Sequence, residues 1–204
     1  MYKLYWAPDT GAFAPEVVLA LAGAPVELLP VDYHGKEQQG AAYRKLNPMG
    51  QIPLLILPDG TVMTESAAMV LHLVDAFPEA GLAPPPGSPE RAVFDRWLVF
   101  MAVNLYTADL RLYYAERYST DPAAVSGIKA AATRDLDRQF AIIEEALAAG
   151  PFLQGAKRSA ADLYLLMLSD WYPAARDLPA IARLRAALLD DPVVFEVRSR
   201  YRKD

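Results

Sequence analysis

The sequence contains no cysteine and only two histidines, His34 and His72, and these absences narrow the chemistry that the chain can perform. Without cysteine there can be no disulfide, no thiolate metal site and no catalytic thiol that belongs to the protein itself. With two histidines, a histidine-based metal site is not expected either. Any thiol that reacts here must therefore be carried by a ligand.

Basic clusters and long apolar runs are also lacking. The 204 residues carry a net charge of −5, and no group of Lys and Arg is dense enough to indicate a nucleic-acid partner. No apolar run approaches the roughly 18 residues that a membrane span needs. The apolar residues 17–26 follow Pro15 and Glu16, which favours a buried helix over a secretion signal. Because 53% of the residues are hydrophobic and 22% are charged, we expect a folded globular protein. Without a predicted secretion signal or membrane span, its expected location is the cytoplasm.

The first 77 residues alternate between strand and helix signals. Four short strands are expected, the last two joined by the turn Pro58-Asp59-Gly60, over residues 2–6, 26–31, 54–57 and 61–64. Three helices are expected, the first with Pro15 in its first turn and Gly23 after its end, over residues 15–22, 37–46 and 65–77. A helical crossover makes the first two strands parallel, whereas the hairpin makes the last two antiparallel.

A proline-rich segment follows this α/β part of the chain. Five of the 17 prolines lie in residues 78–89, which predicts a linker between a domain over residues 1–77 and a second domain over residues 90–204. The second domain is expected to be entirely helical, with helices over residues 90–117, 121–149, 159–174, 178–189 and 192–201. Two segments, 97–106 and 163–168, are apolar on nearly all sides and must be covered on several faces.

Two motifs in the chain resemble signatures of the glutathione S-transferase family. Residues 47–53, NPMGQIP, followed by a hairpin and Glu65-Ser66, are similar to the family's glutathione-site motif. Residues 152–155, FLQG, with Ser159 and Asp162, are similar to its C-terminal folding motif, in which the last two residues form a capping box. The resemblance implies an α/β thioredoxin-like N-terminal domain followed by an all-α helical C-terminal domain.

The resemblance implies that the N-terminal domain binds glutathione as a co-substrate, without a metal. A cis peptide bond between Ile52 and Pro53 would present the main chain of Ile52, next to Gln51, to the extended tripeptide. An extended ligand can pair with a free strand edge through its main chain in this way. Gln51, Ile52 and Pro53 are therefore candidate glutathione-binding residues.

The two ends of glutathione would meet charged or polar groups. Ser66 and the unpaired N–H groups at the start of the helix over residues 65–77 would bind the γ-glutamyl carboxylate, and Glu65 would face the ammonium group. The alternative for Glu65 or Ser66 is a helix cap alone. Lys36 would offer a cation to the glycyl carboxylate, although a solvated surface lysine fits its position equally well.

The group that activates the thiol has several candidates. The chain most resembles the bacterial class with a cysteine near the start of the first helix, but Gly11 stands at that position, and Tyr106 stands where the class has a histidine. Thr10 is the nearest hydroxyl and the candidate catalytic residue. The N–H groups of Gly11 and Ala12, or the hydroxyl of Tyr5 or of Tyr106, are alternatives. The hydroxyl of Thr10 would otherwise only close the turn before the helix.

These features together predict a homodimeric glutathione transferase that stabilises the glutathione thiolate and passes it to a small hydrophobic electrophile. The electrophile would contact the helix over residues 104–114, including Tyr106, Tyr113 and Tyr114. Loss of the cysteine and histidine positions leaves two alternatives open. One is a non-catalytic protein-interaction domain of the same family, and the other is a glutathione-dependent peroxidase or isomerase.

Overall fold

The computed structural model describes residues 1–202, which form two compact units. The first unit consists of residues 1–86 together with the segment that begins at Leu189, and the second unit consists of residues 87–188. The helix over residues 192–201 was predicted to belong to the second domain, because it lies at the end of the chain. In the structure it makes its contacts with the first unit. The thioredoxin-like sheet and the all-helical C-terminal part confirm the predicted fold class.

The first unit contains a four-stranded sheet. Its strand order is β2-β1-β3-β4, and the strands are β1 Tyr2–Trp6, β2 Val26–Pro30, β3 Leu54–Ile56 and β4 Val62–Met63. β1 is parallel to β2 and antiparallel to β3, and β3 is antiparallel to β4. Both strand directions predicted from the connections are thus confirmed.

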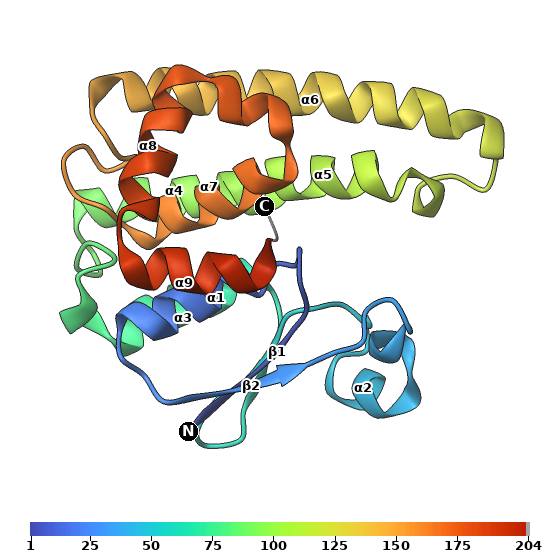
Figure 1. Cartoon of the computed structure of the whole chain (residues 1–204), viewed down its shortest axis with the longest axis horizontal. Coiled ribbons are helices and arrows are strands. Elements are labelled where there is room, and N and C mark those ends of the chain that lie inside the picture. The colour runs from blue at the N-terminus through green and yellow to red at the C-terminus, as the bar shows by residue number, and fades with distance from the viewer. Residues whose placement is uncertain (203–204) are drawn as a thin grey trace. The chain divides into compact units, whose positions relative to one another are not determined.

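The helices of the first unit include α1 Phe13–Leu21, α3 Ser66–Ala76 and α9 Pro192–Tyr201, and α1 contacts both of the others. Figure 1 shows these three helices together on one side of β1 and β2. Because α1 is covered from several directions, nearly all of its residues are buried. Side chains from the sheet and from these helices share one core, with no exposure at Leu4, Leu54, Val17 and Met69. Burying each large apolar side chain stabilises the unit by about 1.5–3 kcal/mol.

The predicted continuous helix over residues 37–46 is wrong. The structure has a 3-10 turn, Glu37–Gln39, and then the short helix α2, Ala41–Leu46, separated by Gly40. Gly40 adopts an extended backbone (φ −68°, ψ 154°), so it ends the first element and begins the second.

The second unit consists of helices (Figure 1). They are α4 Pro89–Phe100, α5 Tyr106–Tyr113, α6 Val125–Ala146, α7 Ala160–Trp171 and α8 Pro179–Leu189. Residues 160–170 of α7 are all buried, in agreement with the prediction that residues 163–168 are covered on several faces. Among the described residues, no helix is both long enough and apolar enough to cross a bilayer.

The prediction of one unbroken helix over residues 90–117 is also wrong. A π-helical turn, Met101–Leu105, separates α4 from α5, and α5 ends at Tyr113. The side chain of Asn104 donates a hydrogen bond to the Phe100 carbonyl (2.9 Å), and Thr107 Oγ1 donates one to the Val103 carbonyl (2.8 Å). These side chains compete for carbonyls that an ordinary helix pairs with main-chain N–H groups, which favours a local change in helix type.

Candidate functional site

The turn over residues 47–53 is held by the side chain of Asn47, which is 2% exposed. Asn47 Nδ2 donates to the Gln51 carbonyl (2.8 Å), and its Oδ1 accepts from the N–H of Met49 (3.1 Å). The hydroxyl of Tyr43 donates to the same Gln51 carbonyl (2.8 Å). Gly50 has φ +61°, and a Cβ there would lie 2.9 Å from the Gln38 carbonyl oxygen. Asn and Gly at these positions therefore shape the turn that leads into β3.

Ile52 lies at the end of this turn, directly before β3. The Ile52–Pro53 peptide bond is cis, as predicted. Among residues 1–202, no hydrogen bond uses the main-chain N–H or C=O of Ile52. Both groups are therefore available to an extended ligand, as strand addition requires. Gln51 is exposed, but its carbonyl is already used by Tyr43 and Asn47.

The start of α3 carries the second part of the motif. Glu65 is exposed and has an uncommon backbone for a non-glycine residue (φ 64°, ψ 99°). Its carboxylate makes no capping hydrogen bond, so a purely capping role is not what the structure shows for Glu65. Ser66 is buried at the first position of α3, where the N–H groups of the first turn have no partner within the helix.

Lys36 lies in an exposed loop between β2 and α2, with a left-handed backbone (φ 59°). Asp32 orders this loop, because its Oδ1 accepts from the N–H of Gly35 (2.8 Å) and its own N–H donates to Glu37 Oε2 (2.7 Å). The position of Lys36 is consistent with either of the two roles that the sequence left open.

The loop between β1 and α1 contains the candidate catalytic residue. Thr10 Oγ1 donates its one hydrogen to the Ala7 carbonyl (2.7 Å), an arrangement that closes the turn. The N–H groups of Gly11 and Ala12 are buried and make no hydrogen bond to another described residue. The indole N–H of Trp6 at the end of β1 also lacks a partner among the described residues. The loop and the end of β1 therefore hold three N–H donors that make no hydrogen bond to a described residue, and sequence analysis missed the one on Trp6.

Tyr106 and Tyr113 both contact the end of α7 in the second unit. The ring of Tyr106 packs edge-on against Trp171, with ring centroids 5.0 Å apart. The hydroxyl of Tyr113 donates a hydrogen bond to the main-chain carbonyl of Trp171. Both tyrosines project from α5 and are partly or largely exposed, so an apolar ligand bound to this unit could reach them.

Asp109 is a buried acid of α5 that sequence analysis did not single out. Its side chain is 2% exposed, and neither carboxylate oxygen has a hydrogen-bond partner among the described residues. Burial raises the pKa of Asp109 to about 8. Its spacing of three residues from Tyr106 on one helix could have drawn attention to it, since residues so placed share a helix face. Among residues 1–202, no group of acidic and histidine side chains could hold a metal ion.

A thioredoxin-like sheet with a cis-proline turn before β3, together with an all-helical second part, defines the fold of the glutathione transferases. The family described as "Glutathione S-transferase, N-terminal domain" matches residues 13–76. The chain is 33% identical over 176 residues to the uncharacterised GST-like protein YncG of Escherichia coli K12, covering 85% of this chain and 83% of YncG. This chain is thus a member of the glutathione S-transferase family.

Two further relatives extend the comparison over nearly the whole chain. The glutathione S-transferase GstA of Escherichia coli O157:H7 is 29% identical over 202 residues, covering 97% of each protein. The structure of a sphingomonad glutathione S-transferase complexed with glutathione superimposes with a TM-score of 0.83 at 28% identity, covering 97% of each chain. The recognition of the family from residues 47–53 and 152–162 is thereby confirmed.

Proposed function

We propose that the protein is a cytoplasmic glutathione transferase whose first unit binds glutathione and whose bound thiolate attacks a small hydrophobic electrophile. The observation that carries the proposal is the main chain of Ile52 before β3, which makes no hydrogen bond to another described residue, in the same unit as the start of α3 with Glu65 and Ser66. The glutathione complex of the sphingomonad relative supports it. In this arrangement the Ile52 main chain pairs with the cysteinyl residue of glutathione, and the start of α3 binds the γ-glutamyl group.

The thiol would be activated by hydrogen-bond donors of the β1–α1 loop. A free thiol has a pKa near 8.5, and N–H groups at a helix start lower it because they stabilise the thiolate. The unused N–H groups of Gly11 and Ala12 are suited to this role. The thiolate then forms a bond from sulfur to the electrophilic carbon, and the displaced group leaves with the bonding electron pair. Lys36 would neutralise the glycyl carboxylate.

Titration calorimetry with glutathione tests the binding proposal. Wild-type protein should bind millimolar or lower glutathione, and Ser66→Ala and Glu65→Ala should each weaken binding about tenfold or more, since each removes a contact to a charged group. Glu79→Ala, at another exposed glutamate of the same unit, is the matched control and should bind as the wild type does. The proposal would be refuted if the wild-type protein does not bind glutathione at millimolar concentration.

The donor that acts on the thiol can be identified from the ultraviolet absorbance of the bound thiolate. If the N–H groups of Gly11 and Ala12 act, Thr10→Val leaves the pKa of bound glutathione nearly unchanged. If the hydroxyl of Thr10 leaves the Ala7 carbonyl to donate to sulfur, the same variant raises the pKa by about 1–2 units. A shift in Tyr5→Phe or Tyr106→Phe alone would assign the role to a tyrosine.

A non-catalytic glutathione-binding domain is the second candidate function, because the hydroxyl of Thr10 is already engaged with Ala7. One screen of wild-type protein with glutathione against haloarenes, epoxides, hydroperoxides and disulfides separates the candidates. Turnover of any one class supports an enzyme and identifies transfer or reduction as its reaction. Glutathione binding without turnover across the screen supports the interaction domain.

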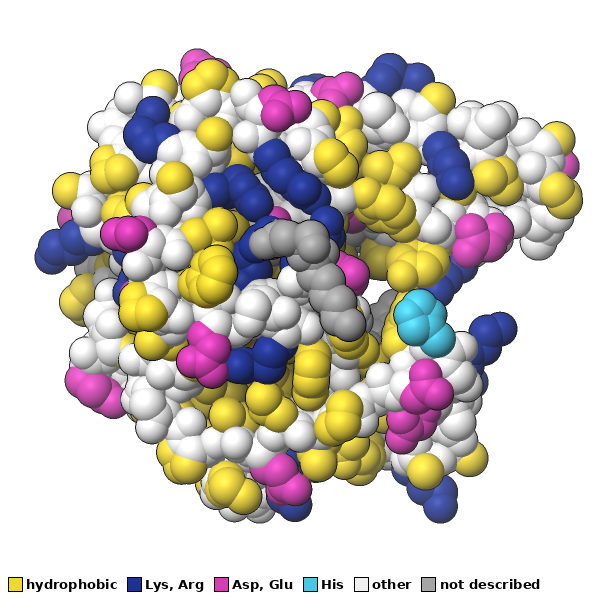
Figure 2. All heavy atoms as spheres, in the orientation of Figure 1, with side chains coloured by type: hydrophobic (Ala, Val, Ile, Leu, Met, Phe, Trp, Pro, Cys, Tyr) yellow, Lys and Arg dark blue, Asp and Glu magenta, His cyan; other side chains and the backbone are white. Residues whose placement is uncertain are grey.

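We also propose a homodimer formed in part through α4 and the π-helical turn after it. Three valines there are 44%, 48% and 58% exposed, namely Val93, Val99 and Val103. Scattered hydrophobic side chains such as those on the face in Figure 2 are ordinary on a protein surface, so the proposal depends on the three valines. Light scattering should give about twice the chain mass of 22.4 kDa. Val103→Glu should shift the mass towards the monomer, whereas Ile142→Glu, at an exposed site on α6, should not.

A further inference from the structure

Glu16 on α1 is a buried carboxylate, 1% exposed, in an otherwise apolar helix. The end of α9 supplies its partners: Arg200 approaches Glu16 Oε1 with Nε at 2.8 Å and Nη2 at 2.6 Å, and the Tyr201 hydroxyl donates to Oε2 (2.6 Å). A buried charge without such partners would be strongly destabilising. The end of α9 is therefore anchored on the first turn of α1.

Tyr201 also contacts both ends of the β1–α1 loop. Its carbonyl accepts a hydrogen bond from the N–H of Asp9 (3.3 Å). Its ring lies 5.3 Å from the indole of Trp6 and packs edge-on against Phe13 at 5.6 Å, measured between ring centroids. Tyr201 therefore contacts residues before, within and after the loop that carries Thr10 and Gly11.

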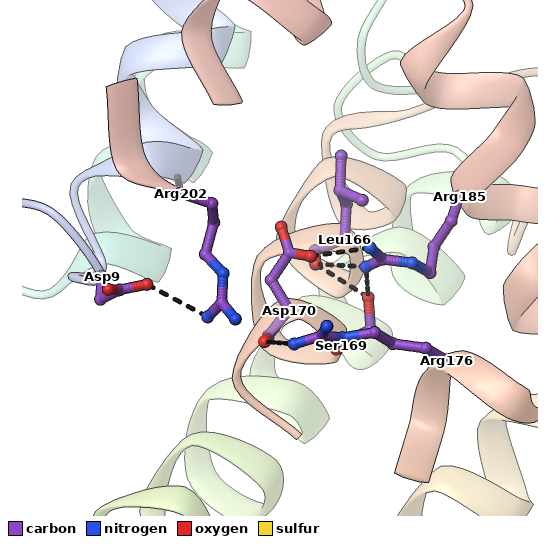
Figure 3. A network of polar contacts seen from close by, with 7 residues as sticks. All are labelled: Asp9, Leu166, Ser169, Asp170, Arg176, Arg185 and Arg202. Atoms are coloured by element: carbon purple, nitrogen blue, oxygen red, sulfur yellow. Dashed lines mark hydrogen bonds and ion pairs between the residues drawn. The ribbon is translucent and has the colours of Figure 1, made fainter. Parts of the chain in front are cut away.

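Arg202 adds a charged contact to the same loop. Its guanidinium forms an ion pair with the carboxylate of Asp9, with Nη1 and Oδ1 3.1 Å apart, as Figure 3 shows. Asp9 has a left-handed backbone (φ 54°), which is uncommon for a residue other than glycine. The ion pair and the hydrogen bond to the Tyr201 carbonyl both act on this residue, one position before Thr10.

We propose that the end of α9 is a part of the thiol site, in which Tyr201 positions the β1–α1 loop and the Asp9–Arg202 pair sets the charge that a bound thiolate meets. This inference rests on the proposed binding of glutathione. Arg202 acts through the loop and through its field, so it is a positioning residue and not a catalytic one.

Removing the charge of Asp9 and removing the charge of Arg202 should have opposite effects on the pKa of a thiol bound near the loop. Arg200 pairs with both Glu16 and Glu196 (3.2 Å), so this group keeps one net negative charge. Among residues 1–202, no ion pair joins it to Asp9 or Arg202, and the substitutions below leave its charge unchanged. Removing the charge of Arg202 leaves the Asp9 carboxylate uncompensated, which disfavours a thiolate nearby. Removing the charge of Asp9 leaves the guanidinium uncompensated, which favours a thiolate. Because the side chains of Arg202 and Asp9 are 27% and 61% exposed, solvent and salt screen both effects.

The test is the pH titration of thiolate absorbance for glutathione bound to full-length variants. Arg202→Met should raise the thiol pKa by a few tenths of a unit and Asp9→Asn should lower it by a similar amount, as expected for partly screened charges. The double variant should return to the wild-type value, and Arg202→Lys, which keeps the charge, should titrate as the wild type does. High salt should reduce both shifts.

The matched control is the exposed ion pair between Lys3 and Glu27, 3.3 Å apart, at the opposite end of β1 from the loop. Lys3→Met and Glu27→Gln should leave the thiol pKa unchanged. If Arg202→Met and Asp9→Asn shift the pKa in the same direction, or do not shift it while glutathione still binds, the inference is wrong and the proposed function stands. If wild-type protein binds no glutathione, both are wrong.

Discussion

Two aspartates of the helical unit are almost equally buried but have opposite surroundings. Asp162, at the start of α7, accepts hydrogen bonds from the N–H of Leu153 (2.8 Å), the N–H of Ser159 (2.7 Å) and the hydroxyl of Ser159 (2.8 Å). Asp109, on α5, accepts none from any described residue. Burial raises the pKa of both, but to about 6 for Asp162 and to about 8 for Asp109.

The difference shows what hydrogen-bond donors contribute at a buried acid. Burial disfavours the charged form of either carboxyl, and the donors around Asp162 offset part of that effect because they bind the carboxylate. Asp162 therefore links the segment before α7 to the helix start, whereas the carboxyl of Asp109 makes no hydrogen bond to a described residue. A third buried acid in this unit, Asp170, has a partner as Asp162 does, because it forms an ion pair with Arg185 at 2.7 Å (Figure 3).

Replacing Asp162 should have the largest effect. Asp162→Ala leaves the buried N–H groups of Leu153 and Ser159 without an acceptor, so the free energy of unfolding should fall by about 3 kcal/mol or more. Urea unfolding measures this change. The control is Asp121→Ala, which removes an exposed helix cap and should cost about 0.5–1 kcal/mol. Equal losses in the two variants would show that burial adds nothing to the role of Asp162.

The stability of the protein should fall as pH rises from 6 to 8. The pKa of Asp109 is higher in the folded state than its ordinary value near 4, so protonation stabilises the fold, fully below pH 4, and this contribution is lost as pH rises through about 8. Across this window we expect the free energy of unfolding to fall by about 1–2 kcal/mol. The range from pH 6 to 8 lies above the pKa of Asp162, which is about 6. The pH dependence in this range can therefore be assigned to Asp109 and not to Asp162.

Urea unfolding at several pH values measures that slope, and Asp109→Asn should flatten it because asparagine does not titrate. An unchanged slope in Asp109→Asn would assign the pH dependence to another group.

The smallest expected effect is a gain in stability. Asp109→Leu removes a buried polar group that has no partner among the described residues, and the free energy of unfolding at pH 7 should rise by about 1 kcal/mol. Asp162→Leu, the same change at the satisfied acid, should instead destabilise the protein. Thermal unfolding compares them, and destabilisation of similar size in both would mean that leucine does not fit at position 109.

Much of the fold could be predicted because short-range patterns specify it. Asp59-Gly60 indicated the hairpin, and Ser159 with Asp162 indicated the start of α7, since each of these features depends on residues a few positions apart. The interruption at Met101–Leu105 was not predicted, because apolar periodicity is nearly the same in an α-helix and in a single π turn. It depends on carbonyl contacts that the pattern of apolar residues does not show.

The candidate site divides in the same way. The cis bond before Pro53 and the turn around Asn47 were recognisable from residues 47–53, because that turn is stabilised largely by its own side chains. The sequence could not decide whether the Thr10 hydroxyl donates to the main chain of the turn or to the thiol, because a threonine at this position suits both roles. In the structure the hydroxyl donates to the Ala7 carbonyl. Which N–H groups remain unused could be known only once every acceptor nearby was placed.

The sequence by itself determined the order of strands and helices, the glutathione-site turn and the capping box, because the interactions that form them lie within about ten residues. Only the tertiary structure decided which partner each buried charge meets. Glu16 meets Arg200, 184 residues away in the chain, whereas Asp109 meets no donor among the described residues. Both are single acidic residues within amphipathic or apolar helices, and local sequence contains nothing that distinguishes them, since a charge is satisfied or left alone by whichever distant side chain packs against it.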